Sequence, residues 1–212
     1  MKIKMKTKNL VLAGCAAALL GAAVCLCRDS APAPYVPARI AALRAQAGSG
    51  DVEAQVQLGY CYYRGDGVPR NPAEACRWWR AAAEKGSVVA QLDLGTALLE
   101  FGGADRAAEA VRWITGAAES GDDAAQLNLG LLYLQGRAVP RDLRKAAIWL
   151  HRSAAKGDAT AQYNLGLMFE TGQGTARDLA EARRWYARAA QGGHPQAARN
   201  LANLERQETE EK

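Results

Sequence analysis

The feature that most constrains this 212-residue chain is an internal repeat with a period of 35 or 36 residues. The pairs Ala-Gln and Leu-Gly recur in four copies, whose glycines are Gly59, Gly95, Gly130 and Gly166. A second block, Ala-x-x-Trp, follows in each copy and supplies Trp78, Trp113, Trp149 and Trp185. Periods of this length are typical of solenoids, in which each repeat buries its apolar face only against its neighbours.

Both blocks carry apolar residues at helical spacing, so each repeat is predicted to be a helix hairpin. Residues that suit helix N-caps precede the blocks; they are Asp51, Asn71, Ser87, Asp122, Asp142, Asp158 and Asp178. Glycines that suit the left-handed residue after a helix close the units; they are Gly86, Gly121, Gly157 and Gly193. Small residues such as Gly59 and Ala75 would let the two helices approach closely, while Trp78 and its copies fill the space between neighbours. The fold class is therefore all-α, a right-handed α/α superhelix of four hairpins plus a C-terminal capping helix.

The repeat register sets the expected boundaries. We expect an N-terminal signal peptide or anchor over residues 1–30, a Pro/Ala linker over 31–37 and a repeat domain over 38–207. The repeats span about 50–86, 87–121, 122–157 and 158–193, after a short helix over 38–47 and before a capping helix over 195–207. Glu205 replaces the apolar stacking residue of the earlier copies, which predicts that the stack ends there. The tail, 208–212, is expected to fray.

These motifs resemble the SEL-1-like repeat, a relative of the tetratricopeptide repeat, as in the fourth copy: GDATAQYNLGLMFETGQGTARDLAEARRWYARAAQGG. The resemblance covers residues 50 to 193. The second copy departs from it, because its loop from Phe101 to Asp105 is one residue shorter and lacks the Gly-x-Gly turn. We expect that hairpin to be locally irregular. The resemblance implies a protein that binds a protein partner in a groove lined by the first helix of each hairpin.

A stripe of first-helix residues outside the core pattern is the candidate partner-binding surface. In the first repeat, spacings of 4, 3 and 4 residues place Glu53, Gln57, Tyr60 and Arg64 on one helix face. With their copies, the candidates are Gln57, Tyr60, Arg64, Asp93, Thr96, Asn128, Leu131, Asn164 and Leu167. The polar column would hydrogen-bond an extended peptide, and Tyr60, Leu131 and Leu167 would add apolar contacts. The alternative is that the polar column serves local packing or solubility.

Cys61 and Cys76 lie symmetrically about the first hairpin turn. In an exported protein a disulfide between them would staple that hairpin. The alternative is two small apolar packing residues. A metal site is not expected, since the two histidines, His151 and His194, belong to distant units. No cofactor is expected either.

The N-terminal segment from Leu10 to Cys27 carries no charge over 18 residues and follows four lysines. This pattern predicts a signal peptide, cleaved near Ala31 to Ala33, or an uncleaved anchor whose N-terminus stays in the cytoplasm. A third possibility is lipidation of Cys15, because Leu12-Ala13-Gly14-Cys15 resembles the lipobox of bacterial lipoproteins. We expect the repeat domain on the periplasmic side of a bacterial inner membrane, anchored or released.

The charge pattern and the residue motifs argue against nucleic-acid binding and against hydrolysis. The isoelectric point near 9.0 reflects the N-terminal lysines, since after Ser30 the chain has 22 Lys and Arg against 21 Asp and Glu. Such a neutral body does not favour nucleic-acid binding. Ser153 and Lys156 match the Ser-x-x-Lys motif of penicillin-recognising serine enzymes, but Ser153 stands where other copies have alanine, and the partner motifs are missing. We interpret Ser153 as a packing residue, and a hydrolase is a remote alternative.

The sequence thus predicts a non-enzymatic, exported interaction protein that grips a protein partner, such as an envelope component, in its groove. Contact with the membrane would be made through the N-terminal segment alone. The alternative function is a periplasmic immunity protein, which would neutralise a secreted toxin, for example a lipase, by occluding it.

Overall fold

The computed structural model describes residues 37–210, which contain ten α-helices, one short 3₁₀ helix and no strand. The first five helices are α1 (Pro37–Gly48), α2 (Val52–Arg64), α3 (Pro72–Glu84), α4 (Val88–Phe101) and α5 (Ala107–Glu119). The last five are α6 (Asp123–Gln135), α7 (Leu143–Ala155), α8 (Ala159–Thr171), α9 (Leu179–Gln191) and α10 (Ala197–Glu210). All ten belong to one unit, Ala31–Lys212. The expected signal peptide or anchor, with Cys15, lies outside the described residues.

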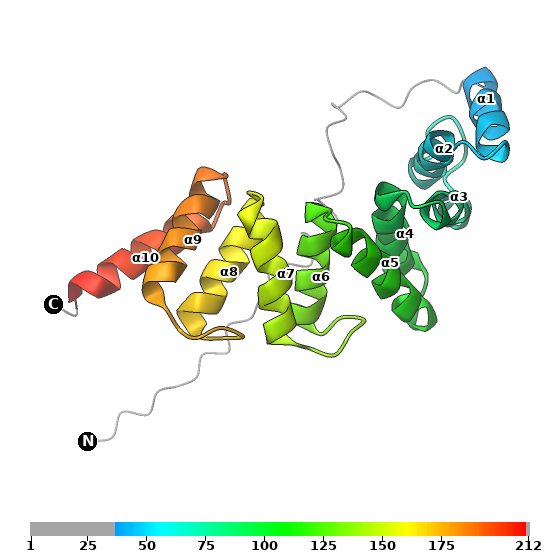
Figure 1. The fold of residues 1–212 in the computed structure, drawn as a ribbon. Coiled ribbons are helices and arrows are strands. Elements are labelled where there is room, and N and C mark those ends of the chain that lie inside the picture. Colours follow the sequence, from blue (N-terminus) through cyan, green and yellow to red (C-terminus); the bar gives the residue numbers. More distant parts are fainter. Residues whose placement is uncertain (1–36, 211–212) are drawn as a thin grey trace. The chain divides into compact units, whose positions relative to one another are not determined.

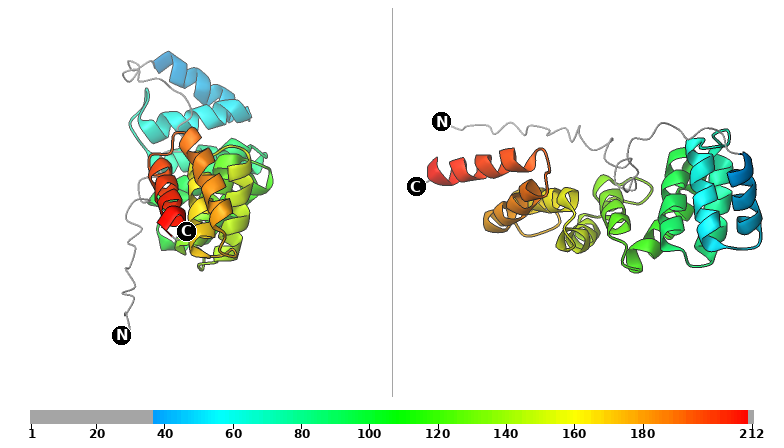
Figure 2. Two further views of the ribbon diagram at one scale, coloured as in Figure 1. Left: turned by 90° about the vertical axis from the view of Figure 1, so that its left-hand side faces the viewer. Right: turned by 90° about the horizontal axis from the view of Figure 1, so that it is seen from above.

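Each helix packs against the next one along the chain, as Figures 1 and 2 show. The hairpins are α2–α3, α4–α5, α6–α7 and α8–α9, and the second helix of each hairpin packs on the first helix of the next. Helix α1 packs on α2, and α10 packs on α9. The predicted all-α solenoid is confirmed. No helix within residues 37–210 has the length and apolarity needed to cross a bilayer.

Helix caps set the hairpin boundaries. The side chains of Asp51, Ser87, Asp122 and Asp158 each accept a hydrogen bond from the amide three residues ahead, at the start of a first helix. Asn71, Asp142 and Asp178 do the same for second helices α3, α7 and α9. Gly86, Gly121, Gly157 and Gly193 adopt φ values between 82° and 103°, so consecutive hairpins follow each other with almost no linker.

Close packing inside each hairpin depends on a glycine facing a large side chain. A Cβ atom on Gly59 would lie 2.3 Å from Nε1 of Trp79, and one on Gly166 would lie 2.7 Å from the ring of Tyr186. Gly95 and Gly130 face Ile114 and Leu150 in the same way. These facing residues come one position after the tryptophans singled out by the sequence, and all four are buried. Trp78, Trp113 and Trp149 are half-buried and pack against the apolar cluster shared with the preceding unit, and Trp185 is buried. The tryptophans thus help to fill the space between neighbours, as the sequence predicted, while the residues that follow them fill the hairpins.

The Ala-Gln pair joins neighbouring hairpins, a role that the sequence analysis did not assign. Nε2 of Gln55 donates a hydrogen bond to the carbonyl oxygen of Ala47 at 3.0 Å. Gln91, Gln126 and Gln162 bond in the same way to the helix that precedes them. Each of these carbonyl oxygens also accepts a hydrogen bond from the backbone amide three residues later, so the glutamine adds a second bond that ties two successive units together.

The second hairpin is irregular, as the sequence predicted. Phe101 stands where Gly65, Gly136 and Gly172 cap the first helix in the left-handed conformation. Helix α4 is therefore one residue longer than α2, α6 and α8, and a 3₁₀ helix, η2 (Ala104–Arg106), replaces part of the loop. Helix α5 begins without a side-chain cap. A second irregularity lies in the third hairpin loop, where Ala138 has a φ of 61°.

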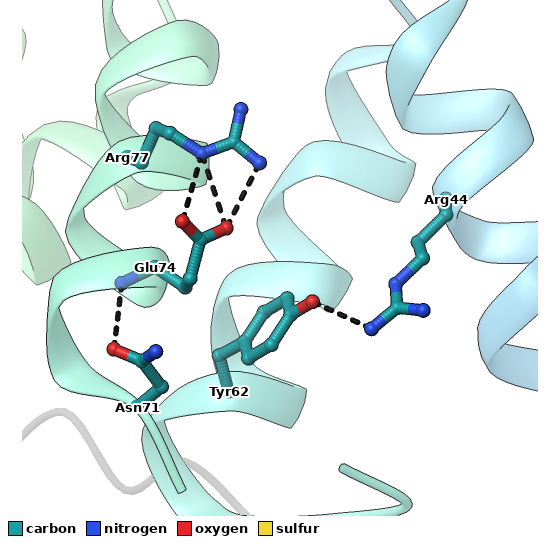
Figure 3. Close-up of polar contacts among 5 residues, drawn as sticks. All are labelled: Arg44, Tyr62, Asn71, Glu74 and Arg77. Atoms are coloured by element: carbon teal, nitrogen blue, oxygen red, sulfur yellow. Dashed lines mark hydrogen bonds and ion pairs between the residues drawn. The ribbon is translucent and has the colours of Figure 1, made fainter. Parts of the chain in front are cut away.

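Helices α1 and α10 cover the two ends of the stack. Ile40 and Leu43 of α1 are buried against Leu58 of α2. Figure 3 shows Arg44 of α1 donating a hydrogen bond to the hydroxyl of Tyr62 at 2.8 Å, beside the Asn71 cap of α3. At the other end Leu204 of α10 is buried, and Glu205 is exposed. The apolar faces of the first and last hairpins are thus covered by single helices.

Candidate partner-binding surface

The structure separates the nine predicted stripe residues by their accessibility. Gln57 and Arg64 are exposed, and Tyr60, Thr96 and Leu167 are half-buried. The other four are buried, with exposed fractions of 6% for Asp93, 3% for Asn128, 2% for Asn164 and 0% for Leu131. Of the two interpretations of the column of Gln57 and its copies, partner binding requires a row of accessible polar groups. In this structure only Gln57 of that column is open to a partner.

The buried members of the column are occupied by internal contacts. The Tyr60 hydroxyl donates a hydrogen bond to Oδ2 of Asp93 at 2.5 Å, which joins the first hairpin to the second. Nδ2 of Asn164 donates to the carbonyl oxygen of Thr160 at 2.8 Å. Asn200, one repeat further on, donates to the hydroxyl of Tyr163 at 3.4 Å. These contacts favour the alternative interpretation, local packing, for the buried polar residues.

A different group of exposed and half-buried side chains comes from α2, the loop after it and α4. We call it the α2–α4 patch, and it consists of Tyr60, Tyr63, Arg64, Arg70 and Phe101. The rings of Tyr60 and Tyr63 each lie 5.4 Å from the ring of the buried Trp79, centroid to centroid. The Phe101 ring lies 6.0 Å from Tyr63 and is 42% exposed.

Two arginines cover the rings of the patch. The guanidinium carbon of Arg70 lies 5.4 Å from the centroid of Phe101 and 5.9 Å from that of Tyr63. The guanidinium carbon of Arg64 lies 5.9 Å from the centroid of Tyr60. Cation–π attraction of this kind holds the guanidinium groups at defined positions. Nε of Arg70 also donates to the carbonyl oxygen of Tyr63 at 3.0 Å, which restricts it further.

Burial and acidic neighbours raise the pKa values of the tyrosines of the patch. The Tyr63 hydroxyl donates to Oε2 of Glu100 at 2.7 Å, and burial together with this bond raises the pKa of Tyr63 to about 12. Burial and the neighbouring Asp93 raise the pKa of Tyr60 as well. Burial raises the pKa of Asp93 to about 6, although the bond from Tyr60 acts in the opposite direction. The phenols are therefore neutral donors near neutral pH.

The patch is suited to protein recognition by composition. Tyrosine and arginine are enriched among the residues that dominate binding energy at protein interfaces. Val89, at the opposite end of α4, is 50% exposed and adds apolar surface to the same helix. The sequence analysis found Tyr60 and Arg64 but missed Tyr63, Arg70 and Phe101. The signal that would have found Phe101 is a phenylalanine at a position where the other three repeats have glycine.

The predicted disulfide is absent, which corrects the sequence analysis. Cys61 and Cys76 are both free and buried. Cys61 packs with Ile40 and Leu43 of α1, whereas Cys76 packs with Trp79 and the residues of α4. The two thiols thus lie in separate apolar clusters, one on each side of the hairpin, and the alternative interpretation as packing residues is correct. Burial raises the pKa of both thiols.

The other residues considered for catalysis or metal binding make packing contacts or hydrogen bonds within the fold. Ser153 is fully buried, and Nζ of Lys156 donates to the carbonyl oxygen of Gly121 in the preceding unit. His151 packs edge-on against Trp185, and His194 stacks on Tyr163 at 4.1 Å between ring centroids. Within residues 37–210 no three His, Cys, Asp or Glu side chains gather as metal ligands would.

The fold and this surface define a helical-repeat solenoid with an aromatic and arginine-rich face. The family model of the Sel1 repeat matches residues 52–87, 88–122, 123–158 and 159–194, so the chain belongs to the Sel1 repeat family. Sel1 repeats generally mediate protein–protein interaction, and the scaffold is typically non-catalytic. No curated protein matches the chain.

Solved structures of the same family resemble the chain. One is c5321, a protective antigen present in uropathogenic Escherichia coli strains, with 33% identity and a TM-score of 0.73 over 79% of this chain and 36% of that one. Another is a Sel1 repeat protein from Oxalobacter formigenes, with 35% identity and a TM-score of 0.69 over 78% of this chain and 48% of that one. The chain thus spans less than half the length of either protein.

A third structure is that of the immunity protein Pa5087 from Pseudomonas aeruginosa. It is 20% identical, with a TM-score of 0.47 over 75% of this chain and 59% of that one. A likeness at this level carries no argument about the function of the present chain.

Proposed function

We propose that this chain is an exported protein-interaction module that holds a protein partner along its first helices, with the α2–α4 patch as the main contact. The observation that carries the proposal is the exposed Phe101, held between Tyr63 and Arg70 on a family scaffold that generally binds proteins. Export rests on the uncharged segment from Leu10 to Cys27 behind four lysines.

The geometry of the patch supports binding because its side chains are held in place before a partner arrives. Tyr60 and Tyr63 are fixed by Trp79 below and by their bonds to Asp93 and Glu100. An interface that is ordered in advance loses less conformational entropy on binding. A partner that covers Phe101 would also gain about 1 kcal/mol from burying the 42% of this side chain that is exposed.

The proposal is tested by capture from cells of the source organism with the tagged full chain. The double variant Phe101→Ala, Arg70→Ala removes the exposed ring and the cation above it. It should reduce the amount of partner captured by about tenfold or more and leave the melting temperature unchanged. The matched control is Arg112→Ala on α5, which also removes an arginine stacked on an aromatic ring. Equal capture by the double variant and the wild type would overturn the assignment of the patch.

Export is tested separately by protease treatment of cells whose outer membrane has been opened. The repeat domain should be digested without lysis of the inner membrane, and its full protection would refute export. The captured partner then distinguishes two roles for the same surface. An envelope component would make the chain a scaffold, whereas a toxin as the sole stoichiometric partner would make it an inhibitor.

A further inference from the structure

Each second helix has a stripe of three residues spaced four positions apart. In three repeats the central residue of the stripe is arginine, but in the third repeat it is isoleucine with an arginine on each side. The stripe reads Ala73-Arg77-Ala81 in α3, Ala108-Arg112-Gly116 in α5 and Ala180-Arg184-Arg188 in α9. In α7 it reads Arg144-Ile148-Arg152. Residues four apart share one helix face, so an isoleucine with an arginine on each side replaces the usual central arginine. Ile148 is 53% exposed.

A pocket of about 350 Å³ opens beside this α7 stripe. It is lined by Ala147, Ile148, His151 and Arg152 of α7, by Leu165 and Phe169 of α8, and by Thr175 of the following loop. Most of these side chains are apolar. Because Ile148 is both exposed and part of the lining, the pocket and the stripe form one continuous surface.

The pocket lies where one side chain is smaller than at two other junctions. Between α5 and α6 the equivalent positions are Val111 and Val139, which pack in one apolar cluster. Between α1 and α2 they are Ile40 and Val68, which also pack together. Between α7 and α8 they are Ala147 and Thr175. Threonine has almost the volume of valine, so it is the small Ala147 that leaves the space open.

The charge around the pocket differs from that on the earlier second helices. Helix α3 has two arginines and two glutamates, and α5 has one arginine and two glutamates. Helix α7 has three cationic residues, Arg144, Lys145 and Arg152, and no acidic one. Helix α9 has three arginines and one glutamate, Glu181, which pairs with Arg184 at 2.5 Å. The basic face is thus confined to α7 and α9 among the four second helices.

We propose that the α7 stripe and its pocket form a second binding site, which takes an acidic peptide segment with one apolar side chain. The apolar side chain enters the pocket beside Ile148, and carboxylates before and after it pair with Arg144 and Arg152. The guanidinium carbon of Arg152 lies 4.5 Å from the ring centroid of Trp149, so this cation is already positioned. Complementary charge on the two surfaces sets the direction of the peptide and speeds its association.

The pattern of charged and apolar groups favours a peptide over an anionic membrane. Helices that lie on a lipid surface present a continuous apolar face that enters the bilayer, whereas here a single isoleucine stands between two arginines beside a pocket of about 350 Å³. The site is also separate from the α2–α4 patch, because it is built from α7, α8 and the loop that follows α8. It can therefore be tested independently of the proposed partner.

The test is selection of a random peptide library on the immobilised full chain, followed by affinity measurement with the selected peptides as labelled probes. The selected peptides should share a leucine, isoleucine, phenylalanine or methionine with acidic residues on both sides. Arg144→Ala with Arg152→Ala should weaken their binding by about tenfold or more. Ala147→Val should weaken it comparably by filling the pocket as Val111 does between α5 and α6. The control, Arg112→Ala on α5, should bind like the wild type.

Each other outcome overturns the proposal. Selected peptides without acidic residues, or an affinity that neither the arginine double variant nor Ala147→Val changes, would refute it. So would the recovery of no binding peptide. If phosphatidylglycerol vesicles retain the wild type but not the arginine double variant, while peptides fail to bind, the face is a lipid-binding surface instead. Circular dichroism of the valine variant establishes that it keeps its fold.

Discussion

The junction between the first two hairpins and the junction between the last two are built on the same backbone and filled in opposite ways. At the first, Tyr60, Tyr63 and Trp79 pack into a continuous aromatic cluster that reaches the surface at Phe101. At the second, the small Ala147 leaves a pocket beside the exposed Ile148. Gln91 and Gln162 make the same hydrogen bond at the two junctions, and the helices that follow have the same kind of N-cap and glycine contact.

The difference teaches that the repeated residues of this chain build the stack, whereas its candidate binding surfaces lie where a repeat departs from the others. Phe101 replaces a cap glycine, and Ile148 replaces an arginine. Asp93 is also a departure, because the equivalent residues are Gln57, Asn128 and Asn164. Substitutions at these positions and at their equivalents in other repeats test whether repeated residues build the stack while the departures have other roles.

The largest effect is expected from Gly59→Ala. Its Cβ would lie 2.3 Å from the rigid indole of Trp79, whereas Gly130→Ala would lie 2.8 Å from Cγ of the more adaptable Leu150. We expect losses in the free energy of unfolding of about 3 kcal/mol for Gly59→Ala and about 2 kcal/mol for Gly130→Ala. Urea denaturation measures both. Gly48→Ala, which meets no atom within 4 Å, is the control and should change it by less than about 0.5 kcal/mol. Equal losses for Gly59→Ala and Gly48→Ala would contradict the packing described here.

The next effect concerns the buried carboxyl at the first junction. Asp93→Asn should stabilise the fold by about 1 to 3 kcal/mol at neutral pH, because burial of the charged carboxylate is removed while an acceptor for Tyr60 remains. The reciprocal change at the last junction, Asn164→Asp, should destabilise it, since Asn164 is buried and donates to Thr160. Chemical denaturation of both variants tests the contrast, which fails if the two changes have the same sign.

The same carboxyl predicts a pH dependence. The pKa of Asp93 is about 6 in the fold and 3.8 as the ordinary value, so the folded state holds the proton more tightly. The contribution of Asp93 to stability is therefore greatest below about pH 4 and is lost as the pH rises through about 6. The free energy of unfolding of the wild type, relative to that of Asp93→Asn, should fall between about pH 4 and pH 7. A difference that is flat over this window would show that the carboxyl is not perturbed.

A smaller effect is expected in the third hairpin loop. Ala138 has a φ of 61°, while the equivalent positions are Gly67 and Gly174, with φ values of 71° and 77°. Ala138→Gly should stabilise the chain by about 0.5 to 1 kcal/mol, because left-handed backbone strains an alanine. Ala176→Gly in the last loop is the control and should not stabilise it. The melting temperature distinguishes them, and a loss of stability in Ala138→Gly would contradict the account.

The smallest perturbation is chemical labelling of the two thiols in the first hairpin. Both are buried and free, and their pKa values are raised, so neither should react with maleimide in the folded chain. Both should react after unfolding without reductant, as counted by mass spectrometry of the peptides that contain Cys61 and Cys76. Protection of the pair after unfolding would mean that they are bonded.

The fold was largely predictable from the sequence, and the site was not, for one physical reason. The N-caps, the glycines after the helices, and Gly59 with its copies Gly95, Gly130 and Gly166 make contacts within one hairpin. Their spacing in the sequence therefore predicts the helices and hairpins directly. Accessibility depends on the neighbouring hairpin. Asp93 and Asn128 were predicted to be free because one helix face was considered alone, and both are buried in the stack. Cys61 and Cys76 were paired by their distance from the turn, although they belong to opposite sides of the hairpin.

The central claim is that partner binding uses the α2–α4 patch, and hydroxyl-radical footprinting of the chain with and without its captured partner tests it most directly. Side-chain oxidation of Phe101, Tyr63 and Tyr60 should fall in the complex, because these rings would be covered. Oxidation of Trp113, a half-buried ring on second helix α5, should stay the same. Protection of Trp113 with unchanged oxidation of Phe101 and Tyr63 would contradict the claim.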